Sequence, residues 1–350
     1  LAFVDDYAQN VLHTIEDPTI REILYDTRGC LIYQEQIMAI LNQVFGFAKE
    51  DGETLRKSIG KKNKEIVDAW EEKIYKAAED RGITKYTADW FWGAVNASAD
   101  YSFNKSHAIS YASLAAQTIY LKFHHPQEFY LECLRMAQSR QDPLTETALI
   151  KEELKNFGIR MLPPDLVKSK MEFTVEGEDI RFGISAIKGV AGKSIGNIED
   201  FIGKRTENKF QVFEAAKQAG LGLGVVSPLI QAGALYSMGD KRPLLVLEAQ
   251  LWSLLTDKER AYAIKEGGKW DWSLLRMVKD ITEWTDDRGK KVARKTRFDT
   301  IKKNYDKYKQ IYLANNQSPE FAAYVYERRL LGYAYSGRLK DIFIKDSRGK

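Results

Sequence analysis

One stretch decides how the first part of this chain folds: Tyr101-Ser102-Phe103-Asn104-Lys105-Ser106-His107-Ala108. It places a short polar run directly before an uninterrupted helical pattern over residues 109–123. Asn104 and Ser106 are good N-cap residues, and the backbone N–H groups at a helix start point outward. With Lys105 and His107 beside them, these donors indicate an anion site, most naturally for phosphate. A capped helix end with a solvated lysine is the competing interpretation, which the stretch alone favours.

The composition is that of an ordinary globular protein. Hydrophobic residues make up 44% of the 350 residues and charged residues 29%, enough for two or three packed domains. A net charge of +4 is weak evidence for a polyanion partner, so the placement of the charges matters more. Cys30 and Cys133 show no metal-ligand spacing, which argues against a zinc site or a disulfide framework and predicts a reducing, cytoplasmic location. No apolar run approaches the roughly 18 residues of a membrane span, so we expect no membrane partner.

Residues 1–135 are predicted to be almost all helix. Three helical patterns, each ended by a glycine, cover residues 31–41, 50–59 and 65–81. Around the second of these glycines lie five basic residues in nine positions, namely Arg56, Lys57, Lys61, Lys62 and Lys64. Such a cluster fits a grip on a phosphate backbone, and it fits a solvated surface equally well, because helix C-termini favour cations. The aromatic run Trp90-Phe91-Trp92 is predicted to be core, since no Arg or Lys interleaves it.

The composition changes near residues 138–143, which predicts a domain boundary. Beyond it, residues 172–184 alternate between apolar and polar around a glycine and predict a β-hairpin. Residues 184–195 then place two short apolar segments on either side of a Gly-hydrophobic-small-Gly turn. This pattern resembles a helix-hairpin-helix motif, in which backbone N–H groups contact DNA phosphates whatever the base sequence. Ala191 stands where the usual second glycine of that turn would be.

The last part of the chain carries fewer recognisable signals. Residues 242–255 are predicted to form a helix, and the charged residues 286–291 a loop. A basic tract follows, made of Arg294, Lys295, Arg297, Lys302, Lys303, Lys307 and Lys309. It could flank DNA or form a solvated helix face, and the solvated face is favoured.

Several ordered motifs together resemble the C-family bacterial replicative DNA polymerase, the α subunit of DNA polymerase III. They are Leu31-Ile32-Tyr33-Gln34-Glu35-Gln36-Ile37-Met38, residues 55–62, residues 101–107, residues 186–190 and Gly233-Ala234-Leu235. The resemblance covers roughly residues 1–240, with a weaker echo at residues 327–333, while residues 245–320 match poorly. It implies a mainly α fold with a small β-hairpin, in which a helical fingers domain is followed by a helix-hairpin-helix domain.

The resemblance also implies domains and contacts. It assigns residues 1–137 to a fingers-like helical domain, 138–245 to a helix-hairpin-helix duplex DNA-binding domain, and 246–350 to a poorly matching, basic helical extension. Carried over residue by residue, it implies nucleotide binding by Asn104, Lys105, Ser106, His107, Arg56, Lys61 and Lys62. Duplex contacts would come from Lys188, Gly189, Val190, Gly192 and Lys193. The nearest candidate for the family's sliding-clamp peptide is residues 250–255, which fit an amphipathic helix equally well.

No catalytic or metal-binding residue is predicted in this chain. Two-metal phosphoryl transfer needs acidic residues to hold Mg²⁺, and the Asp-x-Asp arrangement of the family's palm does not occur in this sequence. We therefore expect part of a DNA-directed DNA polymerase, a nucleotidyltransferase, that binds dNTP and primer-template DNA. Mg²⁺ and the palm would come from a missing N-terminal part or a separate subunit, and this chain alone would be inactive. The alternative is a non-catalytic DNA-binding accessory protein of replication.

Overall fold

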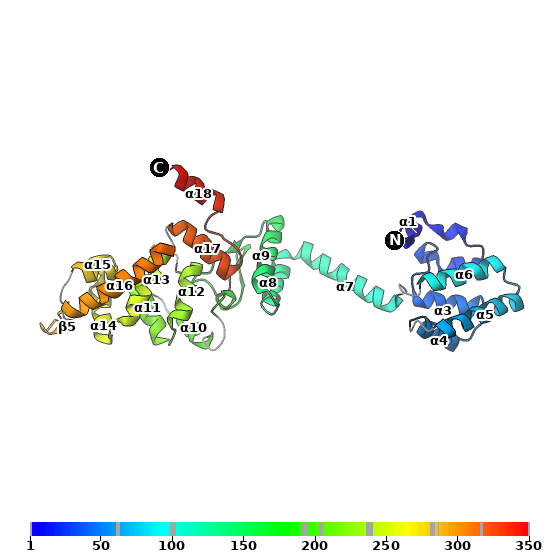
Figure 1. Ribbon diagram of the computed structural model, residues 1–350, viewed down its shortest axis with the longest axis horizontal. Coiled ribbons are helices and arrows are strands. Elements are labelled where there is room, and N and C mark those ends of the chain that lie inside the picture. The colour runs from blue at the N-terminus through cyan, green and yellow to red at the C-terminus, as the bar shows by residue number, and fades with distance from the viewer. Residues whose placement is uncertain are drawn as a thin grey trace. The chain divides into compact units, whose positions relative to one another are not determined.

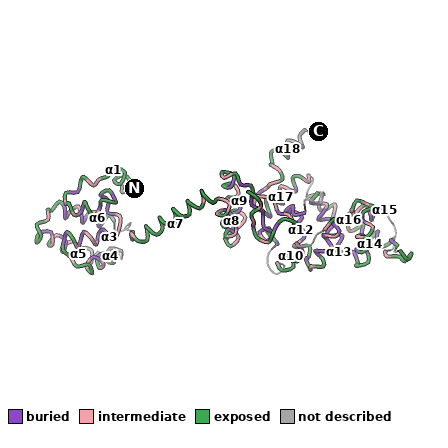
Figure 2. Tube along the Cα trace, turned by 180° about the vertical axis from the view of Figure 1, so that it is seen from behind, coloured by how far each residue is buried: buried purple, intermediate pink, exposed green. Residues whose placement is uncertain are grey.

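The computed structural model describes residues 2–60, 64–98, 103–190, 195–202, 206–235, 241–280, 284–285, 287–293, 295–315 and 318–348. Over these ranges the chain is mainly helical and divides into two compact units, Leu1–Tyr120 and Leu121–Lys350 (Figure 1). Each unit buries its own cluster of apolar side chains (Figure 2). The predicted mainly α class with a small β component is confirmed. No helix among the described residues is both long and apolar enough to cross a membrane.

The first unit is built from helices that follow the predicted pattern. Its elements are α1 (Ala2–Gln9), α2 (Pro18–Ile23), α3 (Gln34–Gln43), α4 (Lys49–Gly60), α5 (Lys64–Arg81) and α6 (Lys85–Ser98), while α7 (Lys105–His124) begins in this unit and ends in the second. Gly46 and Gly82 have positive φ angles of 78° and 67° and follow α3 and α5, as helix-ending glycines do. Helix α3 begins three residues later than predicted, because Ile32 and Tyr33 pair with Phe103 instead.

The core of the first unit uses the aromatic run of α6. Phe91 is fully buried and Trp92 is 6% exposed, which confirms the core prediction for these two residues, and Trp90 is half-buried. The Phe91 ring stacks on Phe45 at 5.0 Å between centroids. Ile74 of α5 is also fully buried in this cluster, so α3, α5 and α6 share one core.

The second unit combines helices with two small sheets. Its helices are α8 (Pro126–Ala137), α9 (Pro143–Leu154), α10 (Ile195–Ile202), α11 (Lys209–Gln218), α12 (Leu223–Ala232), α13 (Arg242–Leu254), α14 (Asp257–Glu266), α15 (Leu274–Asp280), α16 (Lys295–Asn315), α17 (Pro319–Leu331) and α18 (Leu339–Arg348). Its strands are β1 (Met161–Leu162), β2 (Thr174–Glu176), β3 (Asp179–Arg181), β4 (Trp284–Thr285) and β5 (Lys291–Ala293). The predicted helix over residues 242–255 is confirmed. Of the residues predicted as a loop, 287–290 lie between the short strands β4 and β5, while Lys291 begins β5.

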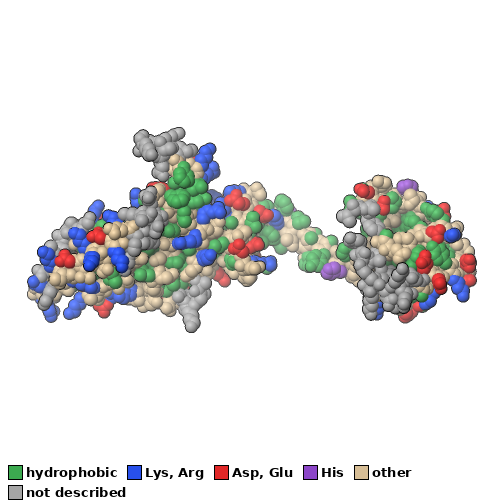
Figure 3. Space-filling view, in the orientation of Figure 1, with side chains coloured by type: hydrophobic (Ala, Val, Ile, Leu, Met, Phe, Trp, Pro, Cys, Tyr) green, Lys and Arg blue, Asp and Glu red, His purple; other side chains and the backbone are tan. Residues whose placement is uncertain are grey.

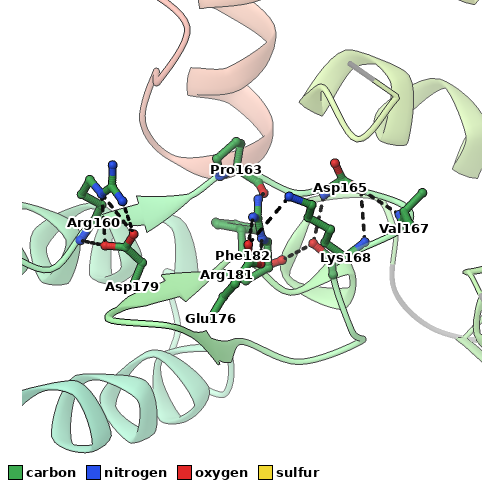
Figure 4. Close-up of polar contacts among 10 residues, drawn as sticks. Arg160, Pro163, Asp165, Val167, Lys168, Glu176, Asp179, Arg181 and Phe182 are labelled. Carbon is green, nitrogen blue, oxygen red and sulfur yellow. Dashed lines mark hydrogen bonds and ion pairs between the residues drawn. The ribbon is translucent and has the colours of Figure 1, made fainter. Parts of the chain in front are cut away.

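The predicted β-hairpin is confirmed as the antiparallel pair β2 and β3. Strand β1 adds to β3 in parallel. Two ion pairs brace this sheet: Arg160 binds the Asp179 carboxylate, and Arg181 binds Glu176 while also donating to the Pro163 carbonyl oxygen at 2.7 Å (Figure 4). The sheet leads directly into the segment that resembles a helix-hairpin-helix motif.

Helix α17 packs against α12, α13 and α9 and so completes the core of the second unit. The fully buried Glu327 carboxylate forms an ion pair with Arg242 at 2.7 Å and accepts from the backbone N–H of Tyr335 at 2.7 Å. The backbone N–H of Lys188 donates to the carbonyl oxygen of Leu330 at 3.0 Å. Residues 319–335 are therefore a structural part of the same unit as residues 158–245.

Candidate functional site

Two segments that the sequence separates by some seventy positions meet in the first unit. Tyr33 and Phe103 form an isolated parallel bridge. The Gln34 N–H donates to the Phe103 carbonyl at 2.9 Å, and the Phe103 N–H donates to the Ile32 carbonyl at 3.1 Å. The motif at the start of α3 and the polar run at the start of α7 thus form one local structure.

Glu35 connects α3 to the first residue of α7. Its two carboxylate oxygens accept from the backbone N–H of Lys105 at 3.0 and 2.9 Å. That N–H has no partner inside its own helix, because the first four donors of a helix lack one. A negative side chain at this end is also favoured by the helix dipole. Glu35 therefore fixes the place where α7 begins.

The predicted N-cap is present, and it occupies one of the backbone N–H groups that were expected to face an anion. The Asn104 side-chain oxygen accepts from the His107 N–H at 3.0 Å, as an N-cap residue does. The backbone donors of Lys105 and His107 are thus occupied by Glu35 and Asn104. These two N–H groups are therefore not available to an anion in this conformation.

The side chains of the polar run reach solvent. Asn104, Ser106 and His107 are exposed, and Lys105 is half-exposed. The Lys105 ammonium lies 3.7 Å from the Asp26 carboxylate and 5.7 Å from the centroid of the Tyr33 ring. Both neighbours hold the Lys105 side chain near α3. This leaves the Lys105 ammonium, the Ser106 hydroxyl and the His107 imidazole as solvent-accessible side-chain groups at the surface where the motifs meet.

Gln36 holds the bridge segment from inside. Its side chain is 5% exposed, and its carbonyl oxygen accepts from the backbone N–H groups of Ile32 and Tyr33 at 3.0 and 2.9 Å. Its amide nitrogen donates to the Thr27 hydroxyl at 2.8 Å. Gln36 is therefore a structural residue, and neither its role nor that of Asp26 and Glu35 was assigned from the sequence.

Most side chains of the basic cluster at the end of α4 and the start of α5 lie outside the described residues. Arg56 belongs to the last turns of α4, and its side chain is outside the described part, as are Lys61 and Lys62. Their predicted meeting with Lys105 at one nucleotide site therefore stays a prediction.

The proposed duplex contacts divide into three groups. Lys188 and Gly189 are exposed, and Gly189 has a positive φ of 92°, which allows a tight turn there. The Val190 side chain is fully buried, and its N–H donates to the Ile187 carbonyl at 3.0 Å, so this residue anchors the turn. Gly192 and Lys193 lie outside the described residues.

The candidate clamp peptide is part of a helix that packs into the core of the second unit. Residues 250–254 lie in α13, where Leu251 and Trp252 are 1% and 2% exposed, and the following Leu255 is 3% exposed. The alternative of an amphipathic helix is therefore confirmed. An extended peptide at this place would have to pull a tryptophan out of the core of the second unit.

A metal site for catalysis is not formed by the described residues. No three His, Cys, Asp or Glu side chains gather there in a way that could hold a metal ion. The described residues do not fit the carboxylate set that Mg²⁺ requires, so no step of the reaction is assigned to such a site in them.

Two family matches define the class of protein. Residues 2–82 match the family described as bacterial DNA polymerase III alpha subunit finger domain, and residues 158–245 match the helix-hairpin-helix motif. The two matched segments fall in the first and second compact units respectively. This chain therefore combines a polymerase finger domain with a helix-hairpin-helix region.

The relatives agree with this class and make it specific. The chain is 33% identical over 235 residues to the DNA polymerase III subunit alpha of Saccharopolyspora erythraea. The match covers 66% of this chain and 19% of that protein. It is 34% identical over 228 residues to the protein of that name from Thermus aquaticus, covering 65% of this chain and 18% of the relative. It is 34% identical over 253 residues to the DNA polymerase III subunit alpha of Halalkalibacterium halodurans. That match covers 70% of this chain and 22% of the relative.

The chain is related to the bacterial DNA polymerase III alpha subunit and comprises the finger domain and the helix-hairpin-helix region of that subunit. It spans about a fifth of the length of the curated relatives that it matches.

Proposed function

We propose that this chain is the fingers and duplex-binding portion of a replicative DNA-directed DNA polymerase, and that it binds the incoming dNTP and primer-template DNA. The contact between Glu35 and the Lys105 N–H supports this proposal most directly. It joins the finger-domain match to the polar run at the start of α7. A purely solvated helix end would need no such connection to another segment.

In this proposal the triphosphate is bound by side chains at the start of α7. Lys105 supplies a positive charge, Ser106 a hydroxyl donor, and His107 an imidazole that lies edge-on to the Tyr111 ring at 4.8 Å. A lysine is a compact point charge that binds phosphate without demanding one fixed geometry. Asp26, 3.7 Å away, would share that charge until the more highly charged triphosphate arrives.

The duplex would be held by the turn at Lys188 and Gly189 in the second unit. Both residues are exposed, and the helix-hairpin-helix match covers them. Contacts of a lysine and backbone groups to phosphates fix position without reading sequence. Such binding suits a polymerase, which has to hold any primer-template.

The chemistry itself would require carboxylates outside this chain. A palm-bearing polymerase portion, on the same or another polypeptide, would hold Mg²⁺, and this chain alone would be inactive. The metal would stabilise the charge that develops on the transferred phosphoryl group.

Primer extension tests the proposal. The chain is mixed with a palm-bearing polymerase portion, primer-template, Mg²⁺ and deoxynucleotides, and extension is expected. Lys105→Ala should raise the KM for dNTP about tenfold, since a hydrogen bond to a charged group contributes roughly 1.5 kcal/mol. Lys85→Ala, which removes an exposed lysine at the start of α6, is the control and should leave KM unchanged.

The result that would overturn the nucleotide role is an unchanged KM for Lys105→Ala. Salt-sensitive DNA binding with neither extension nor any effect of added dNTP would instead indicate the alternative, a non-catalytic DNA-binding accessory protein of replication.

A further inference from the structure

One short segment near the end of this chain carries a large excess of positive charge. Residues 288–309 contain ten Lys and Arg but only two Asp, which gives this segment a charge of +8. The whole chain has a net charge of +4, so all other residues together carry −4. The segment lies beyond both family matches, which end at residues 82 and 245. Its charge therefore needs an explanation of its own.

The fold anchors this segment through buried aromatic rings. Trp284 of β4 is fully buried and stacks on Tyr262 at 4.8 Å between centroids. On its other side it meets Phe298 of α16 edge-on at 4.9 Å. Ile301 and Tyr305 continue the buried stripe of α16. The strand pair and the helix are thus fixed against one core, which leaves their charged positions on the outside.

Seven exposed basic residues result from this packing, and we call them the basic surface. They are Arg288, Lys290, Lys291, Lys295, Lys302, Lys303 and Lys307. Figure 3 shows Lys and Arg side chains gathered at this end of the second unit, over α16 and the strand pair. Arg297 is left out of the basic surface because it is half-buried and forms an ion pair with Glu259 at 3.0 Å.

Like charges stand close together in this arrangement. Lys303 and Lys307 stand four positions apart on α16, where like charges repel each other. Lys290 and Lys291 follow Arg288 at the turn between β4 and β5, where Gly289 has a positive φ of 71°. Concentrated like charges are unfavourable for the folded state by themselves, and a polyanion relieves that repulsion.

Three buried rings favour duplex DNA over single strands as the ligand of this surface. A surface for single strands needs exposed aromatic faces on which unpaired bases stack. Trp284, Phe298 and Tyr305 are each 3% exposed or less, because they form the core beneath the basic surface. Lysine and arginine side chains on a rigid support instead suit the phosphates of a duplex.

We propose that the basic surface is a second binding surface for duplex DNA, which contacts the phosphate backbone independently of base sequence. It extends the duplex binding proposed for the turn at Lys188, and it uses different residues. Its function is to add counterion release, and therefore salt-dependent affinity, to the hold on the duplex.

Duplex binding by the full chain tests this proposal. The variant combines Lys290→Gln, Lys302→Gln and Lys303→Gln, three exposed positions. Fluorescence anisotropy with blunt duplexes of unrelated sequence is measured over a salt series. The slope of log K against log salt should fall by about three, one for each lysine. The Kd at low salt should rise at least about tenfold, equally for each sequence.

The matched control removes the same charge elsewhere. It combines Lys49→Gln, Lys76→Gln and Lys85→Gln, three exposed lysines of the first unit, and should keep the salt slope of the unaltered chain. Equal slopes for the two triple variants would overturn the proposal, because only net charge would then matter. Tighter binding of a single strand of equal length, lost in the basic-surface variant, would overturn the duplex assignment.

A third variant separates this proposal from the proposed function. Lys188→Gln tests the helix-hairpin-helix turn alone. If it leaves duplex binding unchanged while the basic-surface variant weakens it, the contact at the turn is wrong and the basic surface stands. If only Lys188→Gln weakens binding, the reverse holds. Unchanged thermal unfolding of each variant shows that the exposed substitutions leave the fold intact.

Discussion

Replacing Glu35 by alanine should loosen the start of α7 without unfolding the first unit. The carboxylate accepts from the Lys105 N–H with both oxygens, at 3.0 and 2.9 Å, in a half-buried place. A hydrogen bond to a charged group contributes roughly 1.5–3 kcal/mol, and partial exposure favours the lower end. We therefore expect a loss of about 1.5 kcal/mol, which is roughly a tenfold larger population of the opened helix start.

Hydrogen exchange measures this directly at the Lys105 amide. Glu35→Ala should speed exchange in the segment 103–107 about tenfold, in line with the lost free energy. Glu35→Gln keeps an acceptor oxygen without the charge and should show a smaller increase. Glu22→Ala removes an exposed carboxylate of α2 and serves as the control. If exchange at Lys105 were the same in Glu35→Ala as in the unaltered chain, Glu35 would not determine where α7 begins.

Two further predictions concern the second unit. Glu327→Ala should cost about 3–5 kcal/mol in urea unfolding, because it leaves Arg242 as a buried charge without its partner, whereas Glu199→Ala at an exposed place should cost little. The hydrogen bond from Arg160 lowers the pKa of the Asp179 carboxyl below its ordinary value, so its contribution to stability is present at neutral pH and is lost as the pH falls through that lowered pKa, below about pH 4. Arg160→Gln should therefore flatten the dependence of unfolding free energy on pH in that range, and an unchanged acid limb would contradict the assignment.

The sequence predicted the elements with local signals and missed those that depend on a distant partner. Glycines at the ends of α3 and α5 have the positive φ that such helix ends require, so these ends were predictable. Strand β1 was not predictable, because it forms only by pairing with β3. The two prolines beside it favour an extended connector instead. The short strands β4 and β5 were hidden by the charges around their turn.

The candidate site shows the same division. Asn104 was expected to cap α7, and its bond to the His107 N–H agrees with that. The sequence also suggested outward-pointing backbone donors for an anion. Instead, the Lys105 N–H donates to the carboxylate of Glu35, which lies on α3. No local pattern contains that contact, since it depends on the bridge between Tyr33 and Phe103. Two of the backbone donors that the sequence suggested for an anion, those of Lys105 and His107, therefore bind protein side chains instead.

The turn at Lys188 and Gly189 is held by residues that lie well beyond residue 245, where the helix-hairpin-helix match ends. The Lys188 N–H donates to the carbonyl oxygen of Leu330, the next-to-last residue of α17. Glu327, three positions earlier on α17, pairs with Arg242 at the start of α13. A segment that ended at residue 245 would keep the sequence pattern of the motif but lose the Leu330 carbonyl oxygen that accepts from the Lys188 N–H. The turn would then lack a backbone hydrogen bond that ties it to α17 in the complete unit. The surface proposed to hold the duplex is thus a property of the whole second unit, in which α17 positions the turn while the motif supplies the contacts.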